Sequence, residues 1–193
     1  MTDTRPTGAH VSIALLHYPV YDKNRRVVAT AVTNLDIHDI ARLAKTFGLY
    51  RYYVVTPVDE QRTLVERIRS HWRTGWGASY NPKRREALEL LQIAPDLDTV
   101  LADLENTWGR PAKIVVTGAK ASRDTISCTG LRQMLLDGEQ PYLLLFGTGW
   151  GLTEEVSDRA DYVLEPIKGE GDYNHLSVRA AAAIILDRLF GER

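Results

Sequence analysis

The chain has 193 residues and 44% hydrophobic content, enough to bury the core of one domain, so we expect residues 1–193 to fold as a single domain. Its 24 basic and 25 acidic side chains nearly cancel, which excludes a polyanion-binding charge spread over the whole protein. A lone cysteine excludes an internal disulfide, and neither a secretory signal nor a membrane-spanning apolar run is present, so we expect a cytoplasmic protein without a membrane partner.

Segments rich in β-branched and aromatic residues predict strands at 11–18, 27–32, 50–58, 113–118, 141–146 and 161–166. Apolar residues at three-and-four spacing predict helices at 36–47, 60–72, 83–93, 99–108, 129–136 and 177–190. This alternation predicts an α/β fold, with a mostly parallel sheet and helices on both faces. Ligands in such folds bind beyond the carboxyl ends of the strands.

The least regular stretch is RTGWGASYNPKRR, residues 73–85. Long loops inside compact domains are uncommon and often functional, so this stretch is a candidate substrate lid. An ordinary long connection is the alternative.

A glycine-rich loop, Gly147-Thr148-Gly149-Trp150-Gly151-Leu152, follows the apolar strand at 141–146. Glycines leave the backbone open to a flat ligand group, so we expect something to approach this loop closely. Thr153 is the expected N-cap of a following helix that starts with two glutamates. These carboxylates, with the absence of a GxGxxG spacing or P-loop lysine, disfavour NAD and ATP.

A second polar and glycine-rich loop, residues 167–177, precedes the last predicted helix. That helix reads VRAAAAIILDRLF and is apolar around most of its circumference, which implies burial against the sheet and a second surface. A subunit interface would supply that surface.

The segments LLFGTGWGL, DYVLEPI and YNHLSVRAAAAIIL occur in this order. They resemble the C-terminal motifs of a divergent branch of the SPOUT-class (α/β-knot) RNA methyltransferases. The resemblance implies a C-terminal trefoil knot, a homodimer through the knot region, and S-adenosyl-L-methionine as cofactor. The cofactor-binding residues that it implies are Thr117, Gly118, Phe146, Gly147, Thr148, Gly149, Gly151, Leu152, Pro166, Ile167, Tyr173, Asn174, Leu176 and Ser177.

Residues 36–48, DIHDIARLAKTFG, are similar to the first motif of the ribose 2′-O branch of that class. Arg42 matches the family arginine, whereas Asp36 and His175 stand where the family has asparagine. We expect Asp36 to be a helix N-cap and Asp39 to pair with Arg42. A guanidinium suits bidentate phosphate binding, so Arg42 is predicted to anchor the RNA substrate in the catalytic site.

Methylation of a ring nitrogen or a hydroxyl also requires a base. Candidates in or near the motif loops are Asp172, His175 and Asp36, and we predict that Asp172 or His175 takes the role; Arg42 is too basic. A structural role for His175 stays open.

Basic residues cluster at Arg67/Arg69/Arg73, Lys83/Arg84/Arg85 and Lys120/Arg123, with Trp72, Trp76 and Tyr80 among the first two clusters. Arginines neutralise phosphates and aromatic rings stack on unpaired bases, so we predict RNA contacts at Arg42, Arg84 and Arg85. Solvated helix faces are the alternative.

The sequence therefore predicts an S-adenosylmethionine-dependent methyltransferase acting on a nucleotide of tRNA or rRNA. Two alternatives stay open: a catalytically silent knotted RNA-binding or regulatory module, and a nucleotide-binding enzyme of ordinary doubly wound topology. No metal site is predicted, because the five histidines and one cysteine lack ligand spacing.

Overall fold

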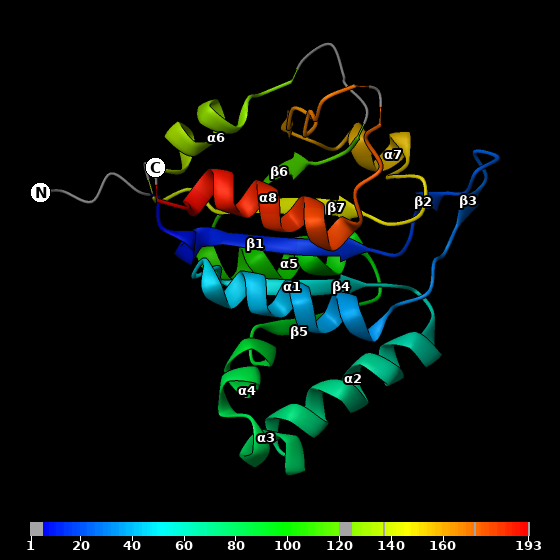
Figure 1. Cartoon of the computed structure of the whole chain (residues 1–193), viewed down its shortest axis with the longest axis vertical. Coiled ribbons are helices and arrows are strands. Elements are labelled where there is room, and N and C mark those ends of the chain that lie inside the picture. Colours follow the sequence, from blue (N-terminus) through cyan, green and yellow to red (C-terminus); the bar gives the residue numbers. More distant parts are fainter. Residues whose placement is uncertain (1–5, 120–124, 137, 172, 193) are drawn as a thin grey trace, which may run out of the picture.

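The computed structural model describes residues 6–119, 125–136, 138–171 and 173–192, and within them one sheet of six parallel strands forms the centre of the fold (Figure 1). The strand order is β5 (Leu91–Ala94), β4 (Arg51–Val55), β1 (Val11–Leu16), β7 (Tyr142–Gly147), β6 (Lys113–Val116) and β8 (Tyr162–Val163). The predicted mostly parallel sheet is confirmed.

Helices cover both faces of this sheet. One core cluster contains apolar residues of α1 (Asn34–Thr46), α4 (Pro82–Leu88), α6 (Cys128–Leu135) and α8 (Val178–Phe190), and the other contains residues of α5 (Leu97–Trp108) and α7 (Glu154–Ser157). In β1, Ile13 and Leu15 join the first cluster while Ala14 and Leu16 join the second. Strands that are buried on both faces are continuous apolar runs, and such runs allowed these strands to be predicted from the sequence.

The predicted strand at 27–32 is wrong as a member of the sheet. Only β3 (Val27–Val28) is extended there, and it pairs antiparallel with β2 (Val20–Tyr21) in a separate hairpin. The turn is closed by the Asp22 carboxylate, which accepts hydrogen bonds from the backbone N–H groups of Asn24 and Arg26 at 2.7 and 2.8 Å. A turn held by the Asp22 side chain therefore makes this segment a short hairpin instead of a long strand of the sheet.

The predictions for 73–93 are also partly wrong. The stretch at 73–85 is mostly helical: α2 (Asp59–Arg73) is followed by α3 (Trp76–Tyr80) and by α4. The predicted helix at 83–93 ends at Leu88, and β5 follows as an edge strand paired with β4. We call residues 59–88, which α2, α3 and α4 occupy, the helical arm; Figure 1 shows it at the lower end of the molecule.

The remaining predicted helices agree with the structure to within about two residues at each end. A short 3-10 turn, Gly8–His10, leads into β1. None of the helices in the described residues is both long and apolar enough to span a membrane.

Candidate cofactor-binding site

The loop after β7 lies against the β2–β3 hairpin. Trp150 donates a backbone hydrogen bond to Tyr21 O at 2.9 Å, and Tyr21 N donates to Gly151 O at 2.9 Å. A Cβ on Gly149 would lie 2.9 Å from Tyr21 O, and one on Gly147 would lie 2.8 Å from the Leu152 side chain. At positions 147 and 149 the protein itself therefore makes a close approach that requires glycine, and contact of these two residues with the cofactor stays a prediction.

Gly151 and Gly118 present a different environment. Among the residues that the structure describes, none lies within 4 Å of a Cβ built at either position, and Gly151 has a φ of +100° that favours glycine. Gly118 follows β6, which lies beside β7 in the sheet. Both stretches of backbone are thus free to be contacted by a ligand at the carboxyl ends of neighbouring strands.

The loops after β6, β7 and β8 meet at this edge because the three strands are neighbours in the sheet. Thr117 is buried and donates its hydroxyl proton to Leu145 O at 2.8 Å, and Pro166 is buried beyond β8. The amide of Asn174 donates to Ala119 O at 3.0 Å, which brings the last loop to the end of β6. The predicted cofactor residues therefore come from adjoining segments.

The last loop places most of its side chains at the surface. Tyr173 is 77% exposed and its ring meets the exposed His175 edge-to-face at 5.4 Å. Leu176 is 45% exposed, and Ser177 is the N-cap of α8, with its hydroxyl accepting from Ala180 N. Asp172, the other predicted base, lies outside the described residues.

Sequence reasoning missed a polar cluster that fixes the glycine loop to the end of β1. Thr148 donates its hydroxyl proton to Leu16 O at 3.0 Å, and its oxygen lies 2.5 Å from the Thr30 hydroxyl. Thr30 is also hydrogen bonded to His17 Nδ1 at 3.0 Å. Burial lowers the pKa of His17 to about 4, although the nearby Asp36 carboxylate opposes the shift, so this histidine is neutral at neutral pH. The signal in the sequence that could have indicated this cluster is a histidine directly after a buried strand.

Asp36 is not the N-cap of α1; Thr33 is, with its hydroxyl oxygen accepting from Asp36 N. The Asp36 side chain is buried and accepts hydrogen bonds from Thr33 Oγ1 at 2.6 Å and from Arg179 Nη1 at 2.8 Å. Arg179 also pairs with Asp39 at 3.4 Å, so the expected Asp39–Arg42 pair is not formed. Arg179, which sequence reasoning left on an apolar helix, therefore joins α8 to α1 and neutralises Asp36.

Two predicted RNA-binding residues, Arg84 and Arg42, lie near His38. The Arg84 guanidinium lies 4.7 Å from the centre of the Trp72 ring, which in turn meets His38 at 5.5 Å. The pKa of His38 is lowered, first by burial and then by the positive charge of Arg84; the Asp39 carboxylate opposes the shift, and Arg42 adds a smaller lowering. This positive potential suits an anion. Arg85 instead pairs with Glu89 at 3.2 Å, and Lys120 and Arg123 lie outside the described residues.

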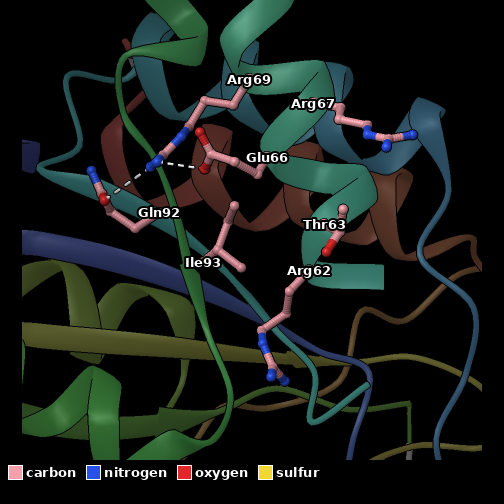
Figure 2. A pocket seen from close by; sticks show the side chains of 7 residues that line it. All are labelled: Arg62, Thr63, Glu66, Arg67, Arg69, Gln92 and Ile93. Carbon is pink, nitrogen blue, oxygen red and sulfur yellow. Dashed lines mark hydrogen bonds and ion pairs between the residues drawn. The ribbon is translucent and has the colours of Figure 1, made fainter. Parts of the chain in front are cut away.

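A separate open cavity of about 490 Å³ lies between α2 and β5, the edge strand farthest from β8 (Figure 2). It is lined by Arg62, Thr63, Glu66, Arg67, Arg69, Gln92 and Ile93. Arg69 points toward Glu66 and Gln92 in Figure 2, with its charge paired to Glu66 at 2.6 Å. No group of three or more His, Cys, Asp or Glu is placed to hold a metal ion among the residues that the structure describes.

Solved structures of other proteins share this fold. A SpoU methyltransferase, AviRb, from Streptomyces viridochromogenes superposes with a TM-score of 0.57 at 18% identity, covering 95% of this chain and 60% of that chain. A probable methylase family protein from Haemophilus influenzae gives a TM-score of 0.62 at 18% identity, covering 94% and 65%. These likenesses confirm the predicted α/β fold.

Residues 10–191 match the family model of SAM-dependent RNA methyltransferases, and the chain belongs to that family. An "Uncharacterized protein" of Aquifex aeolicus is 43% identical over 181 residues, which cover 94% of this chain and 88% of the relative. A "tRNA (guanine-N(1)-)-methyltransferase" of Oleidesulfovibrio alaskensis is 44% identical over 191 residues. That match covers 99% of this chain but 44% of the relative, so the chain spans less than half of that longer protein.

Proposed function

We propose that the chain binds S-adenosylmethionine at the carboxyl ends of β6, β7 and β8 and transfers its methyl group to a nucleotide of tRNA. The observation that carries the proposal is the open backbone at Gly118 and Gly151, on loops that neighbouring strands bring together. Family membership supplies the cofactor, and the tRNA methyltransferase names of the longer relatives favour tRNA over rRNA. When bound, the cofactor supplies an electrophilic methyl group.

The chain's own residues would position the substrate and accept its proton. Arg42 is exposed on α1, beside the positive potential at His38, and would hold an RNA phosphate. His175 is exposed at the entrance to α8 and would take the proton, or Asp172 in the same loop would do so. Asp36 is unsuited to this role because Arg179 and Thr33 already occupy its two carboxylate oxygens.

We further propose that two copies pair through α8, which fits a cytoplasmic RNA-modifying enzyme of this class. Ala180, Ala181, Ala183 and Ile184 stay half-exposed on this helix, so a second surface would bury them. The trefoil knot stays a prediction, since residues 120–124 and 172 lie outside the described chain.

Calorimetry with S-adenosylmethionine tests the site. Gly118→Val adds a side chain into space that the described residues leave open, so we expect it to keep the melting temperature and to weaken cofactor binding by about tenfold or more. Thr63→Val, an exposed change on α2, is the control and should bind normally. Equal affinity of Gly118→Val and the wild type would place the cofactor elsewhere.

Mass spectrometry of tRNA nucleosides from cells lacking the protein tests the reaction and names the base. We expect one methylated nucleoside to be lost, restored by the wild-type gene and not by Gly118→Val. If the purified chain binds cofactor and RNA but no methylated nucleoside depends on it, the silent-module alternative is correct.

A further inference from the structure

Two aromatic side chains of α3 form an exposed stacked pair at the tip of the helical arm. Trp76 and Tyr80 are 67% and 69% exposed. Their ring centres lie 4.5 Å apart, and the ring planes are inclined by 21°. Single exposed aromatic residues are ordinary, but two aligned flat rings form a surface of defined shape. We call this pair the α3 platform.

The platform is held firmly against the end of α2. A Cβ on Gly75 would lie 2.7 Å from the backbone oxygen of His71, and one on Gly77 would lie 2.7 Å from the Trp72 ring. The arm therefore packs closely just before and within α3. The half-buried Trp72 ring contacts Arg84, His38 and His71, so it is less available for stacking than the two exposed rings of the platform.

The segment that carries the platform is rich in basic residues, although three of them pair with glutamates just outside it. Residues 67–85 include six Lys and Arg residues and no Asp or Glu. Arg73, at the end of α2, is exposed and makes no ion pair with the described residues. The Lys83 side chain is 88% exposed and forms an ion pair with Glu86 at 3.2 Å. Anions are thus favoured beside the two rings.

We propose that the α3 platform binds an unpaired base of the RNA substrate, while Arg73 and Lys83 contact the neighbouring phosphates. A single nucleotide strand offers both flat base faces and negative phosphates, whereas a duplex hides its base faces. Figure 1 shows α3 at the end of the molecule opposite α6 and α7, so the platform holds RNA away from the cofactor loops. The inference rests on the proposed action on RNA.

Fluorescence anisotropy with the whole chain and no cofactor tests the platform. The probes are a labelled single-stranded RNA of about twelve nucleotides and a duplex of the same sequence. We expect Trp76→Ala/Tyr80→Ala to weaken single-strand binding by about tenfold or more and to leave duplex binding unchanged. The slope of log Kd against log salt should stay the same, because no charge is removed.

Two further variants separate stacking from packing. Trp76→Leu/Tyr80→Leu keeps apolar bulk without flat rings and should lose the same single-strand affinity, whereas Trp76→Phe/Tyr80→Phe should retain most of it. Leu64→Ala, a 46% exposed change on α2, is the control and should bind normally.

Wild-type single-strand affinity in the leucine variant, or an equal loss for single strand and duplex, overturns the proposal. Binding is measured without methyl transfer, so an inactive enzyme with ring-dependent RNA binding would refute the proposed function alone.

Discussion

The buried His17 predicts how the stability of the protein changes with pH. Its side chain is fully buried, and burial lowers the pKa from 6.5 to about 4. In the unfolded chain the imidazole takes up a proton near pH 6.5, whereas in the folded protein it stays neutral to about pH 4. The unfolded state therefore binds more protons between these values, and stability falls as the pH drops through that window.

The magnitude follows from the two pKa values. From about pH 7 to about pH 4.5, His17 alone should lower the free energy of unfolding by roughly 2 kcal/mol. His17→Gln removes this titration and leaves every other titrating group in place. We therefore expect the variant to lose less stability than the wild type over the same range, by about that amount.

Urea unfolding followed by circular dichroism at several pH values gives the test. The comparison uses the change with pH, so any fixed loss from the missing hydrogen bond to Thr30 cancels. Parallel curves for the wild type and His17→Gln would refute the argument that His17 is buried and neutral.

Two further predictions concern contacts that sequence reasoning did not find. Arg179→Met leaves the buried carboxylate of Asp36 unpaired and should lower the free energy of unfolding by about 2 kcal/mol; Asp36→Asn in the same chain should recover part of it, and additive losses in urea unfolding would contradict the pairing. Gly149→Ala should cost more than Gly109→Ala, because both have a positive φ near +60° but only the first Cβ would crowd Tyr21 O; equal melting temperatures would contradict the contact.

The buried framework of the fold was predictable because its signals are local. The strands β4, β6 and β7 are continuous apolar runs, and Ser177 marks the start of α8 by capping it. The edge strand β5 was not predictable, because its four residues continue the apolar spacing of α4. They form a strand only because they pair with β4. Within the helical arm, α3 was missed because Gly75, Gly77 and Pro82 indicate a loop, while close packing against α2 overrides that preference.

The candidate site was predictable in position and not in its internal contacts. Glycines at strand ends located the loops. The Arg179–Asp36 pair joins residues 143 positions apart, and the Thr148–Thr30 contact joins residues 118 apart. No periodicity in the sequence reports such pairs, which arise only when the sheet brings α8 to α1 and the β2–β3 hairpin to β7. For the same reason, the sequence could not show that Asp36 is paired with Arg179 and is not a free carboxylate.

The contacts of the β7 loop change what its glycines mean. Gly147 and Gly149 let the loop close on Leu152 and on the hairpin, and Thr148 ties it to Leu16, so the loop has its shape from the protein's own hydrogen bonds. A loop ordered in this way costs little entropy to bind a ligand. Recognition can then rest on the backbone left open at Gly151 and at Gly118. The β2–β3 hairpin, which carries none of the motifs that resemble the family, therefore orders the loop that we propose to bind the cofactor.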